Sequence, residues 1–237
     1  MRPSRVFLLA GQSNMVGRGF PLSMAETPDP RLQVWRDGAW ETASDPLGPR
    51  DNAKNGIGPG MSFGLRLLER DPRRDVGLVM CAKGATPISK WQPGRVLYNR
   101  SVEGAKAAGG RLAGILFLQG EYEAESLDDA PAWGTAFRRT FEAFMTDFGP
   151  VPFVLGQIGT LPPDRSPAQQ IVRDQQAVLA EELPGVALVE TIDLPTAPDG
   201  VHFSVDAYRI LGARFADVWL ELAVKRRRRF NRLLTRG

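Results

Sequence analysis

The sequence predicts an α/β protein built on a doubly wound parallel sheet of five strands. Two observations predict it: five short apolar runs recur along the chain, and helical patterns lie between them. An unbroken apolar run that ends in glycine, as the first does at Gly11, is typical of a strand buried on both faces of a parallel sheet. The five runs are Val6–Ala10, Val76–Ala82, Gly114–Leu118, Val151–Ile158 and Val186–Val189.

Five segments between and after these runs predict helices. The pattern of Trp133–Phe148 is the strongest, because phenylalanines recur there at helical spacing and Gly149-Pro150 then ends it. We expect these phenylalanines to be core residues. Ser166-Pro167-Ala168-Gln169 has the form of a capping box, which predicts a helix from there to about Leu183. The other predicted helices are Met61–Glu69, Leu97–Ala108 and a last one from near Ser204 to at least Val224.

Two connections are too long to be plain loops. They span residues 18–60 and 83–96, and both lead from strand ends to helices, so they lie at one edge of the predicted sheet. Within the first, Val34–Trp40 predicts a small hairpin with an Asp-Gly turn.

Composition describes an ordinary globular protein. The 237 residues are 43% hydrophobic and 24% charged, enough to bury a sizeable core. A single cysteine, Cys81, excludes an internal disulfide and zinc sites of the multi-cysteine type, and its apolar surroundings predict a buried thiol. The apolar run before Gly11 is too short for a signal-peptide core, and no stretch approaches a membrane span. We therefore expect a soluble protein, cytoplasmic by default.

Charge divides the chain into a predicted folded domain, residues 1–224, and a basic tail, residues 225–237. The tail holds seven basic and no acidic residues, whereas the remainder holds 23 basic and 27 acidic residues, a net charge of −4. The tail's cations can simply face water at a helix end. Alternatively, Phe230, Leu233 and Leu234 form an apolar face beside them, which would suit weak contact with an anionic membrane or acidic polysaccharide. Nucleic acid is not expected as a partner.

The candidate catalytic residues lie where the predicted sheet would bind a ligand. Ser13 directly follows the first strand, and helix amides beginning there would favour a developing negative charge, although a plain N-cap serine fits the same position. His202 is the only histidine and hence the only side chain suited to act as a base near neutral pH. Asp199, three residues upstream, can orient its ring. A lone surface histidine is the alternative; Ser13 on the same edge favours catalysis.

The order Ser, Asp, His also occurs in α/β-hydrolases, but their glycine two residues after the nucleophile is replaced here by Met15. The chain instead resembles the SGNH/GDSL hydrolase superfamily, and within it the sialate O-acetylesterase-like branch of carbohydrate esterase family six, which includes acetylxylan esterases. The resemblance covers about residues 5–222. The stretches that carry it are Gly11–Met15, Gly56–Gly64, Ala82–Trp91, Leu118–Ala124 and Asp199–Ser204.

The resemblance implies a three-layer, flavodoxin-like fold with Ser13 as nucleophile, His202 as base and Asp199 as its partner. It also implies an oxyanion hole formed by the Ser13 amide, the Gly84 amide and the Gln119 side chain. Physically, each such donor is typically worth about 3 kcal/mol of barrier. The chain departs from the branch at Ala85 and Glu123, which replace a usual glycine and aspartate.

The function that the resemblance implies is a serine esterase that removes small acyl groups, expected to be acetyl, from a carbohydrate or similar carrier through an acyl-enzyme. It needs no metal or organic cofactor. Gln12, Asn14, Glu121 and Trp91 are candidate substrate contacts, although Glu121 is better explained as a tie between loops, and loop tryptophans (also Trp35 and Trp40) could stack on sugars. The alternative is a carbohydrate-binding module on the same fold, without turnover.

Overall fold

A seven-stranded sheet forms the centre of the protein. The computed structural model describes the backbone of residues 2–234 and the side chains of residues 2–227. The strand order is β3-β2-β4-β1-β5-β6-β7, and all neighbours are parallel except β2 and β3. The strands are β1 (Arg5–Gly11), β2 (Leu32–Arg36), β3 (Ala39–Thr42), β4 (Val76–Met80), β5 (Gly114–Leu118), β6 (Phe153–Gly156) and β7 (Val186–Val189).

The predicted hairpin is part of this sheet, so the expectation of five strands is wrong by two. Asp37 and Gly38 have φ of 49° and 82°, the positive values that a tight two-residue hairpin turn of type I′ requires. One side of β2 is buried through Leu32 and Val34, and β2 pairs with the edge of β4. The hairpin therefore covers an edge that would otherwise expose unpaired backbone groups.

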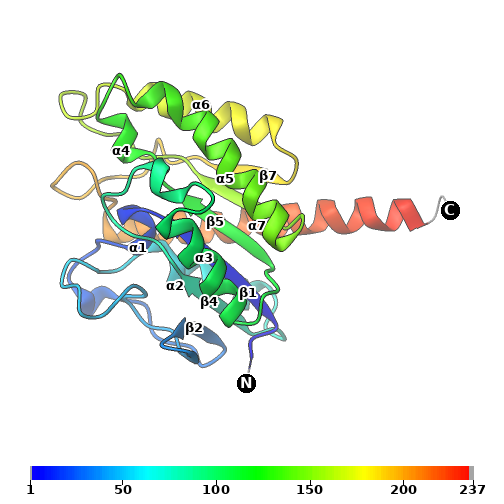
Figure 1. Ribbon diagram of the computed structural model, residues 1–237. Helices are drawn as coiled ribbons and strands as arrows, with labels where there is room; N and C mark the ends of the chain where they lie inside the picture. The colour runs from blue at the N-terminus through cyan, green and yellow to red at the C-terminus, as the bar shows by residue number, and fades with distance from the viewer. Residues whose placement is uncertain (1, 235–237) are drawn as a thin grey trace.

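Helices cover both faces of the sheet, which gives the predicted three layers (Figure 1). α3, α5 and α6 contribute to the core on one face, and α2 and α7 contribute to the core on the other. Two short helices, α1 and α4, directly follow β1 and β5. The helices are α1 (Ser13–Val16), α2 (Pro59–Arg70), α3 (Val96–Ala107), α4 (Glu121–Ala124), α5 (Trp133–Phe148), α6 (Gln169–Glu182) and α7 (Val205–Leu234).

Aromatic side chains dominate both cores. On the α5 face, Phe137 packs against Phe117 and Phe153 with ring centroids 5.6 and 5.7 Å apart, so the predicted phenylalanine stripe of α5 is core packing. On the α7 face, Phe7 meets Phe63 and Trp219 edge to face, both at 4.9 Å. Cys81 is buried as predicted, and burial raises the pKa of its thiol to about 11.

The start of α6 differs from the prediction. The helix begins at Gln169 rather than Pro167, and no side chain caps it. The predicted capping box is wrong because the Gln169 amide pairs with the backbone of Leu161 instead, donating to its carbonyl at 2.7 Å and accepting from its N–H at 2.9 Å. This pair secures the loop after β6.

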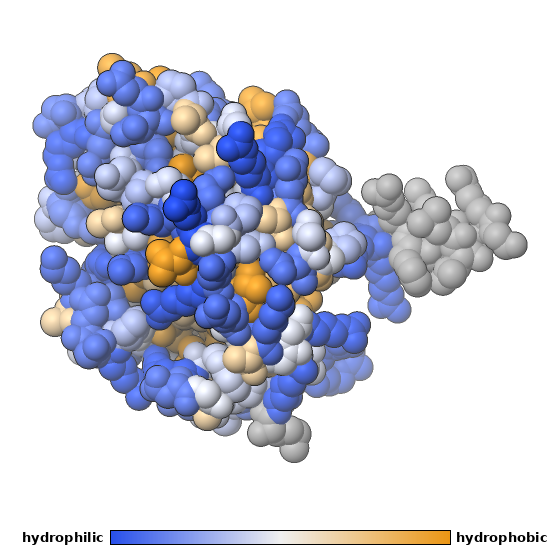
Figure 2. Space-filling model, viewed as in Figure 1, coloured by the Kyte–Doolittle hydropathy of each residue, from blue (hydrophilic) through white to orange (hydrophobic). Residues whose placement is uncertain are grey.

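The last helix, α7, continues beyond the body of the protein (Figure 1). Lys225, Arg226 and Arg227 are exposed on it; the side chains of Phe230, Leu233 and Leu234, on which the predicted apolar face depends, lie outside the described residues. Within the described part of the chain, no helix has the length and apolarity needed to cross a bilayer. The face in Figure 2 is largely hydrophilic, with apolar residues in separate spots.

Candidate active site

Ser13 lies at the carboxyl end of β1, between the ends of β4 and β5. Gly11 makes this position possible: its φ is +134°, and a Cβ there would stand 2.0 Å from the Leu118 carbonyl oxygen. The close approach lets the Gln12 N–H donate to the Leu118 carbonyl at 2.8 Å. Ser13 then begins α1. Open parallel sheets bind their ligands at such a point, where the chain leaves the sheet on either side of a central strand.

Gly84 is brought beside Ser13 by backbone pairing that continues past the end of β4. The Lys83 N–H donates to the Gly11 carbonyl at 2.9 Å, which places Gly84 next to the turn before α1. A Cβ on Gly84 would lie 3.4 Å from the Ser13 Cβ. Neither the Ser13 nor the Gly84 amide donates to an acceptor among the described residues, so both are available to a ligand oxygen.

His202 is held by Asp199 in a tight turn that Gly200, with φ of +73°, permits. One Asp199 oxygen accepts the backbone N–H groups of Val201 and His202, both at 2.9 Å, and the other lies 2.6 Å from Nδ1 of the His202 ring. Partial burial raises the pKa of Asp199, but these hydrogen bonds outweigh it and keep the pKa below its usual value. The ionised carboxylate directs Nδ1 to carry a proton, which leaves Nε2 as the basic nitrogen.

Asn14 connects the serine turn to the histidine turn. Its Nδ2 donates to the Val201 carbonyl at 3.2 Å, and its Oδ1 accepts the Phe203 N–H at 3.2 Å, so one amide holds both neighbours of His202. The same Oδ1 accepts the Tyr208 hydroxyl of α7 at 2.8 Å. Asn14 thus joins the turn that carries Ser13 to the turn that carries His202. Among the described residues, no hydrogen bond links Ser13 Oγ to the His202 ring.

Glu121 completes this connection from the end of β5. Its Oε1 accepts Nδ2 of Asn14 at 2.7 Å, while its other oxygen is buried without a partner among the described residues. Burial raises the pKa of Glu121 to about 7, and the hydrogen bond from Asn14 only partly opposes this. Through its hydrogen bond to Asn14, Glu121 joins the loop after β5 to the loop after β1, as the sequence indicated.

The side-chain amide of Gln119 is hydrogen-bonded inside the protein. It is completely buried, and its Nε2 donates to Glu123 Oε2 at 2.7 Å, to the Thr86 carbonyl at 3.1 Å and to Gln12 Oε1 at 3.2 Å. Its Oε1 accepts from the Trp133 indole, which can only donate, so the amide orientation is unambiguous. The expectation that Gln119 supplies an oxyanion donor is therefore not supported: buried acceptors, one of them a carboxylate, take both of its N–H groups.

The side chains of the other predicted substrate contacts, Asn14, Trp91 and Gln12, are also buried. Asn14 and Trp91 have no exposed surface, and Gln12 has 4%. Trp91 packs edge to face on Phe117, so its ring is not available for a sugar. Of the hairpin tryptophans, Trp40 lies over Gly77 near the start of β4, away from Ser13.

Sequence reasoning missed one side chain at this site, that of Arg18. Its Nη2 would lie 2.4 Å from a Cβ on Gly84. Its position five residues after Ser13, in the segment that follows the candidate nucleophile, was the feature of the sequence that could have indicated it.

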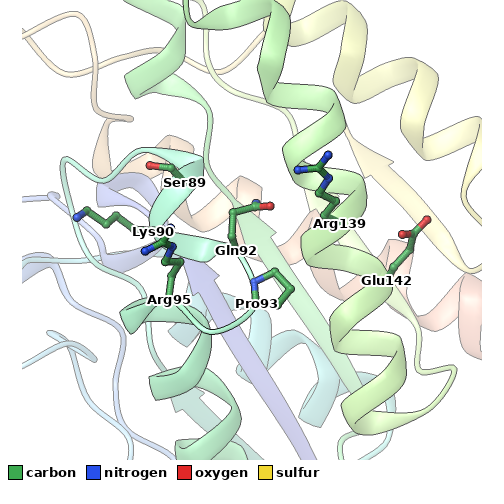
Figure 3. A pocket seen from close by; sticks show the side chains of 7 residues that line it. All are labelled: Ser89, Lys90, Gln92, Pro93, Arg95, Arg139 and Glu142. Carbon is green, nitrogen blue, oxygen red and sulfur yellow. The ribbon is translucent and has the colours of Figure 1, made fainter.

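A separate hollow of about 710 Å³ lies between η2 (Ile88–Trp91) and α5, with none of the catalytic candidates in its walls (Figure 3). Its lining is Ser89, Lys90, Gln92, Pro93, Arg95, Arg139 and Glu142. Among the described residues no group of three or more His, Cys, Asp or Glu side chains is arranged to hold a metal ion.

Comparison with known proteins identifies the family of this chain. Residues 3–221 match the carbohydrate esterase family described as sialic acid-specific acetylesterase. A probable carbohydrate esterase of Arabidopsis thaliana is 31% identical over 92% of this chain and 91% of its own. The X-ray structure of the Arabidopsis protein superposes with a TM-score of 0.83 at 28% identity, covering 92% of this chain and 98% of that one.

Two further solved structures share the fold. NanS has a TM-score of 0.75 at 17% identity, with 95% of this chain and 99% of that chain covered. A carbohydrate acetylesterase from Xanthomonas citri has a TM-score of 0.67 at 20% identity, with 90% of this chain and 54% of that one covered.

Proposed function

The chain belongs to the sialic acid-specific acetylesterase family of carbohydrate esterases, and from that premise we propose that it hydrolyses acetyl esters of carbohydrates through an acyl-enzyme on Ser13. Family membership makes it a carboxylic ester hydrolase. The acetyl group, the covalent intermediate and the roles of individual residues form the proposal.

The proposed reaction needs only groups already at the site. Ser13 Oγ attacks the ester carbonyl carbon while His202 Nε2 takes its proton, and the negative charge that forms on the carbonyl oxygen is stabilised by the Ser13 and Gly84 amides. As the intermediate collapses, His202 gives the proton to the leaving sugar hydroxyl, and the acetyl group remains on Ser13. Water repeats the sequence, with His202 again as base, and acetate leaves.

The observation that carries this proposal is the contact of 2.6 Å between Asp199 and Nδ1 of His202, in a turn that Asn14 links to the nucleophile. A negative charge beside Nδ1 fixes the tautomer and stabilises the imidazolium that forms during the reaction. The serine turn and the histidine turn are almost 190 residues apart in sequence, as the separation between Asn14 and Phe203 shows. Such a pairing has no evident structural purpose in a module that only binds sugar.

Hydrolysis of p-nitrophenyl acetate by the wild type, Ser13→Ala and His202→Ala tests the proposal, with Ser89→Ala as the matched control at an exposed serine. We expect both site variants to lose at least about 10³-fold in kcat/KM and the control to lose none. Mass spectrometry of acid-quenched protein should detect one acetyl group on Ser13. Equal, weak hydrolysis by the wild type and His202→Ala, together with glycan affinity, would instead indicate the binding module.

A further inference from the structure

The Arg18 guanidinium borders the space between Ser13 and Gly84. A Cβ on Gly84 would lie 2.4 Å from Nη2 of Arg18 and 3.4 Å from the Ser13 Cβ, so the guanidinium and the Ser13 side chain border the same small volume. Only glycine leaves that volume open, because any Cβ there would displace the guanidinium. The amide proposed to stabilise the oxyanion belongs to this same Gly84.

Neighbouring backbone holds Arg18 firmly in this position. Residues on either side of it pair with the segment before α2: Gly56 donates to the Gly17 carbonyl at 3.1 Å, and Gly19 and Ile57 exchange two hydrogen bonds of 2.9 Å. The guanidinium itself is anchored through Nη1, which donates to the Gly17 carbonyl at 2.9 Å and to Asn55 Oδ1 at 3.0 Å. Nη2 donates to no acceptor in the described part of the chain.

The charge on Arg18 also lacks a counter-ion. The side chain is half-buried, and no carboxylate among the described residues lies within salt-bridge distance of it. Burial lowers the pKa of the guanidinium, and the compensating influence comes from Tyr208, not from an acidic side chain. A partly desolvated cation without a counter-ion is unfavourable on its own, so a negative charge that forms beside it is stabilised strongly.

The proposed ester hydrolysis creates one such charge, on the carbonyl oxygen of the tetrahedral intermediate. Gln119, the expected third donor, is turned into the interior, which leaves two amides for this oxygen. We propose that Arg18 is a further catalytic residue, whose Nη2 donates to the oxyanion in the place expected for Gln119. No proton is transferred: Arg18 stays protonated, and the charge on the oxygen disappears when the carbonyl re-forms. The inference rests on the proposed esterase function.

Substitution of Arg18 tests this with a small neutral ester, p-nitrophenyl acetate. Arg18→Met should lower kcat about 10²-fold with little change in KM, as removal of an oxyanion donor does elsewhere, and Arg18→Lys should recover part of the loss. Affinity for a boronic acid that forms a negatively charged tetrahedral adduct with serine should fall by a similar factor. Arg111→Met, an exposed arginine before β5 at the opposite edge of the sheet, is the matched control.

Asn55→Asp tests the charge while Arg18 remains in place. Asn55 Oδ1 already accepts from Nη1 at 3.0 Å, so an aspartate there supplies the missing counter-ion. We expect kcat to fall about 10-fold, because a partial neutralisation of the cation weakens its effect on the oxyanion.

Three results would overturn the inference. The first is that Arg18→Met keeps a kcat for the neutral ester within threefold of the wild-type value. The second is that Arg18→Met changes only KM, and only for esters that carry a carboxylate, which would assign Arg18 to substrate binding. A fall in thermal stability that accompanies lost turnover, with boronate affinity unchanged in the remaining folded protein, would assign it a structural role. A wild type no more active than Ser13→Ala would contradict the esterase function itself, so the two failures are distinct.

Discussion

Asn14 offers the sharpest test of how the site is held together. Its side chain has no exposed surface and makes four hydrogen bonds, to Glu121, Val201, Phe203 and Tyr208. Asn14→Ala removes all four while leaving the Ser13 backbone in place. The variant should therefore weaken both the fold and the position of His202.

The size of the effect follows from the four groups left behind. Two of them are acceptors, the Glu121 carboxylate and the Val201 carbonyl, and two are donors, the Phe203 N–H and the Tyr208 hydroxyl. A buried polar group that loses its partner typically costs about 1–3 kcal/mol, and some of the four groups will recruit water. We expect a loss of about 4 kcal/mol in the free energy of unfolding, at the upper end for single substitutions.

Turnover should fall as well, because Asn14 holds both neighbours of the base. A displacement of the order of 1 Å in a catalytic group can lower the rate about 10²-fold, and we expect a loss in kcat of that size for the folded variant. Urea unfolding and p-nitrophenyl acetate hydrolysis measure the two effects, with Asn99→Ala as the control at an exposed asparagine that makes one hydrogen bond.

Asn14→Asp serves if Asn14→Ala does not fold. It keeps an acceptor for Phe203 and Tyr208 but places a second carboxyl group beside Glu121, whose pKa burial has already raised to about 7. One of the two must stay protonated to share a hydrogen bond, so this variant should lose stability and turnover as pH rises from 6 to 9. Wild-type turnover in either folded variant would refute the idea that Asn14 positions His202.

Two further predictions concern regions away from the reacting groups. Burial, reinforced by the charge of Glu26, raises the pKa of Asp45 to about 7, although the Gly58 amide partly opposes this. The stability that goes with the raised pKa of Asp45 is present at low pH and is lost as pH rises through about 7. Thermal unfolding should therefore show that Asp45→Asn stabilises the protein by about 2 kcal/mol at pH 8 and has little effect at pH 5. An equal change in stability at the two pH values would contradict this prediction. Deletion of residues 225–237 should leave turnover of p-nitrophenyl acetate unchanged and reduce retention on anionic vesicles at low salt only, because exposed charges are screened beyond about 8 Å at physiological ionic strength; a folded but inactive truncation would show instead that the tail belongs to the active domain.

Most of the fold could be predicted from sequence because buried parallel strands and amphipathic helices leave strong periodic patterns. β5, β7 and α5 begin and end at the predicted residues. The two added strands could not be assigned to the sheet, since the pattern of Val34–Trp40 describes a hairpin equally well whether it is free or paired. Its pairing depends on the edge of β4 and on the burial of Leu32 and Val34, which are properties of the assembled protein.

In the candidate site, too, some contacts could be predicted from sequence and others could not. Asp199 and His202 are three residues apart, so one tight turn determines their contact, and sequence spacing is enough to predict it. The direction of the Gln119 amide depends instead on Glu123, Thr86 and Trp133, which come from three different segments. Sequence resemblance can identify the residue type at such a position, but only the structure shows which partners take its hydrogen bonds.

The polar residues around Ser13 have a common physical purpose. Three loops from separate strand ends meet here without a regular ladder of backbone hydrogen bonds, and buried side chains supply the missing partners. Gln12, Asn14, Gln119 and Glu121 are used in this way, and each is at least 96% buried. This network holds the three loops together, and apart from one oxygen of Glu121 it leaves no buried polar atom of these side chains unpaired among the described residues.

We therefore expect substrate contacts from side chains that remain accessible on the same loops. Lys83 and Ala85 are exposed on either side of Gly84, and Tyr122, 42% exposed, follows Glu121. Ala85 holds a left-handed φ of 54°, a conformation that glycine adopts more readily, beside the proposed oxyanion hole. We therefore expect substitutions at Lys83, Ala85 and Tyr122 to change the choice of substrate with less effect on stability than substitutions in the buried polar network.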